Sequence, residues 1–278
     1  MTYELIIVGA GIAGLTAARM AAEKGVENVL LLDYQKAPGG FTRPYWEESS
    51  FAQEAELLNK AENLPYEIKT QSTVVGFFPG EPHQLYVQSP EGTYSVEAKR
   101  LLIASGALEK PREAHRIPGS RPAGVMTPMM ALQLLERGYQ PGNRIVLMES
   151  GRITGSAAAL LKKHAGELLT FSGAEWEVTG VTGFSRLEGI TLKNRENGII
   201  REQECDTLIF AKGRIPSTFF LKGTQVERDH HGAIVVDENG RTNLPHVYAA
   251  GSCTSMGDDD HGNSVILAEQ AMRHLLQE

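Results

Sequence analysis

Three glycines with a fixed spacing, near the start of the chain, constrain its fold more than any other feature. Gly9-x-Gly11-x-x-Gly14 follows an apolar run at residues 5–8 and opens an alanine-rich stretch that continues to Met20. Such an order predicts a buried strand, a tight turn and a helix. In a unit of this kind the first glycine permits the turn, the second lets the backbone approach a pyrophosphate, and the third lets the helix pack on the strand. The pattern therefore predicts a dinucleotide site.

An acidic residue closes the next expected strand. Residues 29–32 are apolar and end on Asp33, 24 positions after Gly9. A carboxylate at that place can accept hydrogen bonds from a ribose, while a diphosphate sits on the helix N-terminus, where unpaired N–H groups and the helix dipole favour negative charge. Because the strand, the helix, the second strand and the acid all agree, chance glycines in a turn are a poor explanation of the motif.

Along the rest of the chain, apolar runs alternate with helical stretches, which is typical of an α/β protein. A loop rich in proline, arginine and glycine begins at about residue 110, and the first pattern returns at about residue 244. We therefore predict two Rossmann-like domains of the three-layer ββα type. The first is discontinuous, residues 1–111 and 244–278, and the second, residues 112–243, is reduced. Further strands are expected at 74–78, 85–88, 94–96, 101–103, 145–148, 168–171, 178–181, 189–193, 207–210 and 247–250, and helices at 51–64, 128–137, 153–164 and 264–276.

A second strand–glycine–helix unit, at residues 145–165, has the look of an internal duplication with altered glycines. Its three positions are Glu149, Gly151 and Thr154, and Gly155 is one place late. A glutamate at the tight turn brings bulk and negative charge towards the place of a pyrophosphate, and Coulomb repulsion in a partly desolvated site opposes binding. We interpret the unit as a nucleotide site that has been lost; residual weak binding is the alternative.

The connection after the strand expected at 168–171 is also too short. Residues 172–176 alone separate it from the next strand-like stretch, whereas a parallel crossover through a helix needs roughly 10–12 residues or more. No arginine pair follows this strand to hold a 2′-phosphate. The second domain therefore resembles a Rossmann unit trimmed of a helix, with or without a strand, and predicts the loss of NAD(P)H binding.

Charge and composition exclude other classes of function. A net charge of −7 without a Lys/Arg cluster argues against nucleic acid and against an anionic membrane surface as partners. No window approaches the roughly 18 apolar residues of a membrane span, and the first apolar run is too short for a signal peptide, so we expect a soluble cytoplasmic protein. The cysteines, Cys205 and Cys253, form no C-x-x-C pair. No metal site is predicted.

Four motifs stand in a fixed order along the chain: Gly9-x-Gly11-x-x-Gly14, Pro38-Gly39-Gly40, Ala104-Ser105-Gly106-Ala107 and Val247-Tyr248-Ala249-Ala250-Gly251-Ser252. Their order resembles the two-domain pyridine nucleotide-disulphide oxidoreductase superfamily, and the overall plan resembles thioredoxin reductase. Residues 106–112, 117–119 and 124–127 are similar, more specifically, to the FAD subunits of multi-subunit amine and amino-acid dehydrogenases of the sarcosine, opine and hydroxyproline type. The likeness covers nearly the whole chain, except the trimmed segment after Phe171.

This resemblance implies FAD as the cofactor. Gly9, Gly11 and Gly14 would hold its diphosphate. Asp33 would bind the adenosine ribose, and the backbone of Val74 would contact the adenine. The complete set implied for the cofactor is Gly9, Gly11, Ile12, Ala13, Gly14, Asp33, Tyr34, Gly39, Gly40, Phe41, Val74, Ala104, Ser105, Gly106, Gly251, Ser252 and Ser264.

The resemblance also marks departures from the family pattern. Ser252 stands where most members have an aspartate, so a hydroxyl is kept and a charge is lost. Residues 127–130 stand where thioredoxin reductases carry their C-x-x-C, so dithiol chemistry is lost. The helix that begins near Ser264 would point its N-terminus at the flavin pyrimidine, where a reduced flavin gathers negative charge.

Three local features could have a chemical role. Cys253 could be a redox-active thiol, although a lone cysteine more often packs as a small apolar residue. His261 could donate a proton to the flavin or the substrate. The acidic run at 258–260, just before it, could bind a metal or a cationic partner, although a solvated loop is the commoner case.

We therefore expect a FAD-dependent oxidoreductase of the thioredoxin reductase type. It would act as an electron-transfer or dehydrogenase subunit, with no direct use of NAD(P)H and no redox disulfide. The alternatives are an independent NAD(P)H-dependent flavin reductase and a scaffold or sensor whose FAD is structural. By resemblance, its partners would be a protein or subunit that exchanges electrons and a small amine or amino-acid substrate, and a homodimer is an assembly that the resemblance allows.

Overall fold

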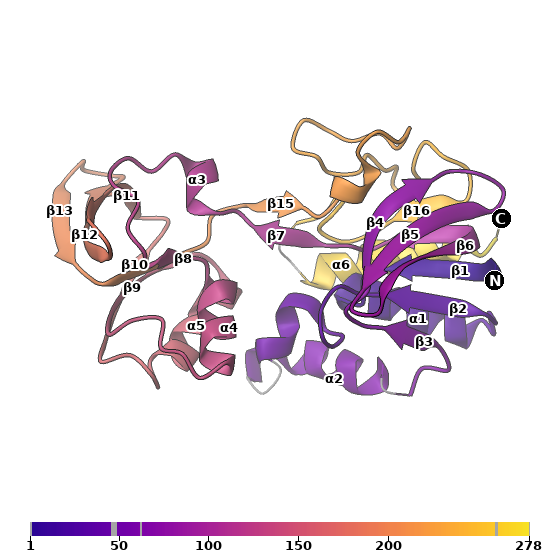
Figure 1. Ribbon diagram of the computed structural model, residues 1–278, viewed down its shortest axis with the longest axis horizontal. Coiled ribbons are helices and arrows are strands. Elements are labelled where there is room, and N and C mark those ends of the chain that lie inside the picture. The colour runs from indigo at the N-terminus through magenta and orange to yellow at the C-terminus, as the bar shows by residue number, and fades with distance from the viewer. Residues whose placement is uncertain (1, 46–48, 62, 259–260, 278) are drawn as a thin grey trace. The chain divides into compact units, whose positions relative to one another are not determined.

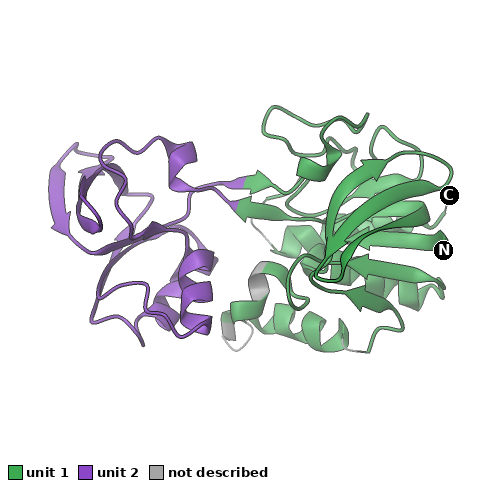
Figure 2. Ribbon diagram, viewed as in Figure 1, with its two compact units in different colours: residues 1–108, 215–278 green, residues 109–214 purple. Residues whose placement is uncertain are grey.

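The computed structural model describes residues 2–45, 49–61, 63–258 and 261–277, without the side chains of Phe41, Thr42 and Ser49 (Figure 1). The chain divides into two compact units (Figure 2). Unit 1 is Met1–Leu108 with Ile215–Glu278, and unit 2 is Glu109–Arg214. The chain passes from one to the other through β7 (Ala107–Glu109) and β15 (Arg214–Pro216), which pair as a two-stranded sheet. Both units are of the predicted α/β type.

Unit 1 is built on a seven-stranded sheet in the order β3-β2-β1-β6-β5-β4, with β16 also paired to β6. The strands β3, β2, β1, β6 and β16 run parallel. In β1, Leu5 and Ile7 face one core cluster, and Ile6 and Val8 face the other. The elements are β1 (Thr2–Val8), β2 (Val29–Leu32), β3 (Glu67–Lys69), β4 (Thr73–Phe78), β5 (His83–Ser89), β6 (Gly92–Ile103) and β16 (Val247–Ala249).

Helices and strands cover opposite faces of this parallel sheet. The helices α1 (Ile12–Glu23) and α6 (His261–Leu275) share one core cluster with α2 (Ala52–Ala61). Side chains of the antiparallel strands β4 and β5 form part of the core cluster on the other face of the sheet, together with residues from later in the chain. The result is the three-layer ββα arrangement that the sequence predicts. Two short 3-10 helices, Gly40–Tyr45 and Ser49–Phe51, precede α2.

One continuous strand replaces the two short strands expected at 94–96 and 101–103. The strand β6 pairs antiparallel with β5 over its first half and parallel with β1 over its second half. Charged residues between the apolar runs hide this continuity in the sequence. Lys99 and Arg100 both turn towards Glu4 of β1, at 2.9 and 3.5 Å, so the polar positions stay solvated while the backbone remains in the sheet.

Residues 215–243, which the sequence pattern assigns to the second domain, belong to unit 1. The 3-10 helix Phe219–Leu221 and the loop after it bury Leu221, Val226 and Ile234 in the cluster that also holds Leu85 of β5. These apolar side chains are spaced irregularly, so the sequence shows no period that would assign them to either domain.

Unit 2 has a parallel sheet in the order β10-β9-β14-β8 and an antiparallel sheet in the order β11-β12-β13. A core cluster that includes Val146, Leu208 and Ile190 joins the two sheets. The elements are α3 (Arg112–His115), β8 (Val125–Met126), α4 (Pro128–Glu136), β9 (Arg144–Glu149), α5 (Arg152–Leu161), β10 (Glu167–Ser172), β11 (Trp176–Gly183), β12 (Leu187–Asn194), β13 (Ile200–Glu204) and β14 (Thr207–Phe210).

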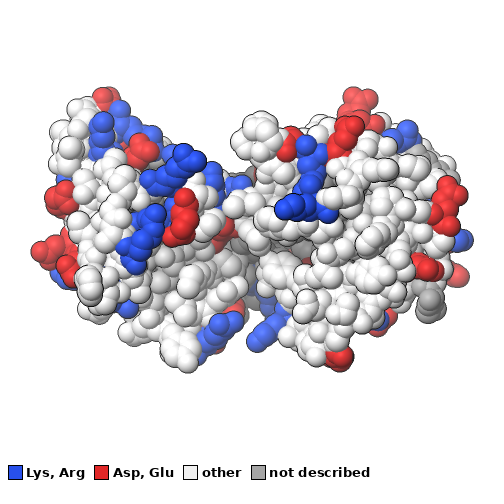
Figure 3. All heavy atoms as spheres, turned by 45° about the horizontal axis from the view of Figure 1, so that its top comes forward, with Lys and Arg blue, Asp and Glu red and all other residues white. Residues whose placement is uncertain are grey.

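The second unit is reduced in the manner predicted. After β10, residues 173–175 form a turn that leads directly into β11 of the other sheet. In this described stretch neither a helix nor a further parallel strand follows, so β10 lies at the edge of its sheet, whereas β2 in unit 1 pairs with β3. Among the described helices, none is long and apolar enough to cross a membrane. On the face of each unit that Figure 3 shows, acidic side chains stand among basic ones.

Candidate functional site

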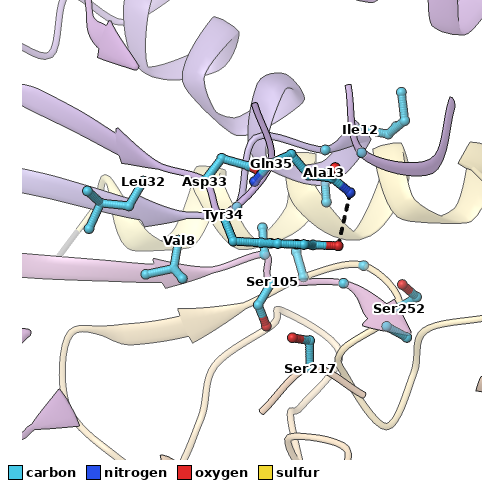
Figure 4. A pocket seen from close by; sticks show the side chains of 18 of the residues that line it. Val8, Ile12, Ala13, Leu32, Asp33, Tyr34, Gln35, Ser105, Ser217 and Ser252 are labelled. Carbon is cyan, nitrogen blue, oxygen red and sulfur yellow. Dashed lines mark hydrogen bonds between the residues drawn. The ribbon is translucent and has the colours of Figure 1, made fainter. Parts of the chain in front are cut away.

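One pocket of unit 1 lies where the parallel strands β1, β2 and β6 end, and Val8, Leu32 and Ala104 line it (Figure 4). The strands β2 and β6 lie on opposite sides of β1, and ligands of open α/β sheets bind at such a reversal of strand order. The pocket collects most of the residues that the sequence assigns to the cofactor: Gly9, Gly11, Ile12, Ala13, Asp33, Tyr34, Gly39, Gly40, Val74, Ala104, Ser105, Gly106, Gly251, Ser252 and Ser264.

Each glycine of the first motif excludes a side chain for a different steric reason. A Cβ on Gly9, whose φ is +106°, would lie 2.2 Å from the carbonyl oxygen of Ala104. A Cβ on Gly14 would lie 1.9 Å from the carbonyl oxygen of Gly9, so Gly14 serves the packing of helix on turn and does not line the pocket. Around Gly11 the nearest atom is the Cα of Gly40, at 4.0 Å. The backbone at Gly11 is therefore open to the pocket.

Asp33 stands in the pocket wall with its carboxylate oriented by the backbone. The N–H of Ala10 donates to Oδ2 at 2.5 Å, and the N–H of Gln35 donates to Oδ1 at 2.7 Å. Burial raises the pKa of Asp33 above its usual value, and the two backbone hydrogen bonds oppose that rise. Beside it, the Nε2 of Gln35 donates to the hydroxyl of Tyr34 at 3.0 Å.

Several pocket residues carry no sequence signal. Ser217 and Phe220 come from the segment 215–243, and in Figure 4 the hydroxyl groups of Ser105 and Ser217 point towards one another. Gln35 and Ser72, which belong to no motif either, also line the pocket, as does Leu108 of the stretch 106–112. The place of Ser217 and Phe220 in the pocket depends on the packing of a segment that is distant in sequence.

His261, the first residue of α6, also lines the pocket. Its Nδ1 lies 2.9 Å from Oε1 of Glu54 in α2, and both side chains are largely buried. The sequence singles out His261, but Glu54 carries no signal, since it is one of several polar residues on a helix. Two further predictions fall outside the described part of the chain: the side chain of Phe41, and Asp259 with Asp260 of the acidic run.

The cysteines are packing residues. Cys253 is completely buried, its Sγ lies 3.4 Å from the carbonyl oxygen of Ala250, and burial raises its pKa. Burial also raises the pKa of Cys205 to about 11. Reactive thiols instead need a lowered pKa and access. Within the described residues, no group of His, Cys, Asp and Glu side chains could hold a metal ion.

The altered motif of unit 2 keeps the backbone plan of the first. The strand β9 ends at Glu149, Gly151 caps the helix, and α5 begins at Arg152, as β1, Gly11 and α1 do in unit 1. The Oγ1 of Thr154 accepts a hydrogen bond from the N–H of Ser150 at 2.6 Å. One backbone N–H group of the turn is therefore already hydrogen-bonded to a side chain. A cavity of about 870 Å³ lies beside this turn, and Glu149 lines it.

Comparison with known proteins gives consistent matches. The family described as pyridine nucleotide-disulphide oxidoreductase matches residues 3–274 of the chain. An opine oxidase subunit of Rhizobium meliloti (strain 1021) is 29% identical over 54% of this chain and 34% of its own length. NADH dehydrogenase of Bacillus subtilis (strain 168) is 38% identical over 32% of this chain, which spans 16% of that protein.

Solved structures share the fold. Thioredoxin reductase from T. acidophilum superposes with a TM-score of 0.76 at 23% identity, over 99% of this chain and 98% of its own. L-proline dehydrogenase from P. horikoshii superposes with a TM-score of 0.74 at 21% identity, over 100% of this chain and 55% of its own. At such identities the likeness concerns the fold alone.

Proposed function

Since the chain belongs to the pyridine nucleotide-disulphide oxidoreductase family, we propose that unit 1 binds FAD in the pocket described above and that the protein is a FAD-dependent oxidoreductase. The observation that carries this proposal is the pocket itself. It joins an open glycine turn, a buried acid and a helix N-terminus within one unit. These are the groups that a diphosphate and a ribose require.

The chain offers a place for each part of the cofactor. The backbone at Gly11, Ile12 and Ala13 would hold the diphosphate, and Asp33 would accept hydrogen bonds from the adenosine ribose. Ser252 and the start of α6 would serve the flavin end. When bound, the flavin supplies the redox chemistry, and the protein binds, orients and shields it.

We further infer that unit 2 does not use NAD(P)H. A carboxylate at Glu149 stands where a nicotinamide nucleotide would bring its own negative charge. The hydroxyl of Thr154 accepts the hydrogen bond of the N–H of Ser150, so this N–H is not available to an anion. The helix and strand that would follow β10 are missing from this described stretch. The two cysteines lie in different units and are both buried, so a redox disulfide is not part of the proposal.

Electrons must then come from elsewhere. One relative is named as a part of an opine oxidase. We take this name as support for an electron-transfer or dehydrogenase subunit that works with a partner protein or with a small amine or amino-acid substrate.

Anaerobic spectroscopy of the purified protein tests this function. We expect a yellow protein with one FAD per chain, slow or no bleaching on mixing with NADH or NADPH, and full bleaching with dithionite. Rapid bleaching by NADPH would identify a flavin reductase and overturn the NAD(P)H-independent role. A flavin that resists dithionite would identify a structural cofactor, and a colourless protein would overturn FAD binding itself.

A further inference from the structure

The cavity of about 870 Å³ beside the altered turn is lined by residues of unit 2 alone. It lies where the parallel strands β9, β10 and β14 end, and Met148, Ser172 and Phe210 line it there. The strands β10 and β14 lie on opposite sides of β9, and open α/β sheets bind ligands at such a reversal of strand order. The cavity therefore has the place of a ligand site, although the proposed function assigns no nicotinamide nucleotide to it.

The charged side chains that line this cavity fall into two groups. Glu177 and Arg195 neutralise one another, with Oε2 of the first 3.3 Å from Nη1 of the second. Glu149, Arg116 and Lys212 form no ion pair with any residue that the structure describes. Opposite charges thus line one cavity without meeting, and one negative and two positive groups are left for a ligand.

The negative group, Glu149, is half-buried at the end of the central strand β9. Gly151 and Gly155 line the cavity on the same turn and helix, and a Cβ on either would meet nothing within 4 Å. This open space lets a cationic group approach the carboxylate. The dipole of α5 opposes a cation at this end of the helix, but it amounts to only about half a charge against the full charge of Glu149.

The two positive groups come from other segments of unit 2. Lys212 lies two residues beyond Phe210, which pairs with Met148 of β9. Arg116 follows α3 with a φ of +54°, a left-handed conformation that is uncommon for a residue with a side chain and that glycine usually supplies after a helix. Backbone strain of this kind is found where a side chain has a function. The strained position therefore supports a role for the guanidinium of Arg116.

The remaining wall of the cavity is largely apolar. Phe210 is buried, and Trp176, which packs edge-on against Phe171 at 6.0 Å, is half-buried. Val178 also lines this wall. His115 packs edge-on against Phe210 at 5.3 Å, and burial lowers its pKa, so it adds no charge near neutral pH. An apolar group of a ligand would be removed from water against this wall, which is favourable.

We propose that the cavity of unit 2 binds a free α-amino acid with a large apolar side chain. The ammonium group meets Glu149, and the carboxylate meets Arg116 and Lys212. The apolar side chain lies against Trp176 and Phe210. Because the cavity offers charges of both signs, a zwitterion satisfies more of them than an anion or a cation alone. The same carboxylate that opposes a nucleotide phosphate thus selects an ammonium group, and this inference does not depend on the FAD site.

Fluorescence titration of the full chain with L-phenylalanine tests this proposal. The chain has two tryptophans, Trp46 and Trp176, so in a Trp46→Phe protein the tryptophan emission reports on the cavity wall alone. Two analogues each lack one charge: 3-phenylpropionate has no ammonium group, and phenethylamine has no carboxylate. We expect L-phenylalanine to change the emission and to bind about tenfold more tightly than either analogue, because each lost contact is a hydrogen bond to a charged group. L-leucine serves as a second probe.

Variants of the charged residues assign the two contacts. Glu149→Gln should abolish the preference for L-phenylalanine over 3-phenylpropionate, and Lys212→Gln should reduce the preference over phenethylamine. Lys193→Gln changes an exposed lysine of β12 that does not line the cavity and should leave all affinities unchanged. The proposal is overturned if neither amino acid binds, or if an analogue binds as tightly as L-phenylalanine. A colourless protein would overturn the proposed function and leave this inference standing.

Discussion

The two strand–glycine–helix units of this protein share a backbone plan and differ in what their turns can bind. In both, a glycine caps the helix within three residues of the strand end, Gly11 in unit 1 and Gly151 in unit 2. In unit 1 the turn leaves its backbone open to the pocket. In unit 2 the side chain of Thr154 fills the turn. The comparison teaches that the fold of such a turn survives changes that remove its use as an anion site.

The strand registers add a second difference. Val8 pairs with Leu32, so Asp33 lies one residue beyond the pair. In unit 2 the corresponding pair is Met148 with Phe171, and the next residue is Ser172. The acid that would bind a ribose in unit 1 is thus replaced by a serine. The antiparallel sheet of unit 2 packs over the same core cluster as β9 and β14, so the shortened domain still buries its apolar residues.

The most damaging way to test unit 1 is Gly9→Ala. The added Cβ would meet the carbonyl oxygen of Ala104 at 2.2 Å and force a left-handed φ of +106° on alanine. We expect loss of bound FAD and destabilisation of roughly 3 kcal/mol or more, measured by the flavin absorbance per chain and by thermal unfolding. Gly155→Ala in α5 is the matched control, because its Cβ would meet nothing within 4 Å. A Gly9→Ala protein that retains full FAD would contradict the assignment of the turn.

Removing the charge of Asp33 should have the next largest effect. Asp33→Asn keeps an oxygen for the N–H of Ala10 but loses the charged acceptor for the ribose. We expect FAD to dissociate about tenfold to a hundredfold more readily, since a hydrogen bond to a charged group contributes about 1.5–3 kcal/mol. Titration of the apo-protein with FAD measures this. Asp206→Asn in unit 2, where the carboxylate accepts from the N–H groups of Asn143 and Arg144, should lower stability and leave FAD affinity unchanged; equal losses in both variants would sink the assignment.

The raised pKa of Asp33 predicts that FAD binding to unit 1 depends on pH. Because burial raises its pKa in the folded protein, Asp33 becomes protonated at a higher pH than an ordinary aspartate. FAD affinity should therefore weaken as the pH falls through that raised pKa, because the protonated carboxyl accepts fewer hydrogen bonds. The free energy of unfolding of the apo-protein should change with pH in the opposite direction. Asp33 contributes to this free energy at low pH, and its contribution declines as the pH rises through the same raised pKa. Affinity that is independent of pH between about 4 and 7, equal in wild type and Asp33→Asn, would argue against this role.

The smallest effect is expected where glycines are restored to unit 2. In Glu149→Gly/Thr154→Gly, the turn loses its negative charge and recovers the N–H of Ser150. We expect NADPH binding to improve by no more than about tenfold, or about 1.4 kcal/mol, because β10 still leads directly into the other sheet. Calorimetry with NADPH measures it. Tight binding in this variant would show that the two side chains alone had closed the site.

Much of the site follows from local patterns. The glycine spacing, the apolar strands and Asp33 lie within one strand–helix–strand segment, where spacing along the chain determines placement in space. The shortness of the connection, residues 172–176 in the sequence pattern and 173–175 in the structure, likewise predicts the reduced second unit, because no helix fits into so few residues. By contrast, the continuity of β6 depends on pairing with both β5 and β1, and no local period reveals it.

By itself, then, the sequence determined the α/β class, the dinucleotide turn of unit 1, the alteration of its copy in unit 2 and the missing crossover after β10, since each is a matter of residue type and spacing over short distances. Only the tertiary structure decided that residues 215–243 pack with unit 1, that Ser217 and Phe220 line the pocket, and that Glu54 meets His261 across 207 residues of chain. These contacts join segments far apart in sequence, and burial of apolar surface, which has no direction along the chain, is what brings them together.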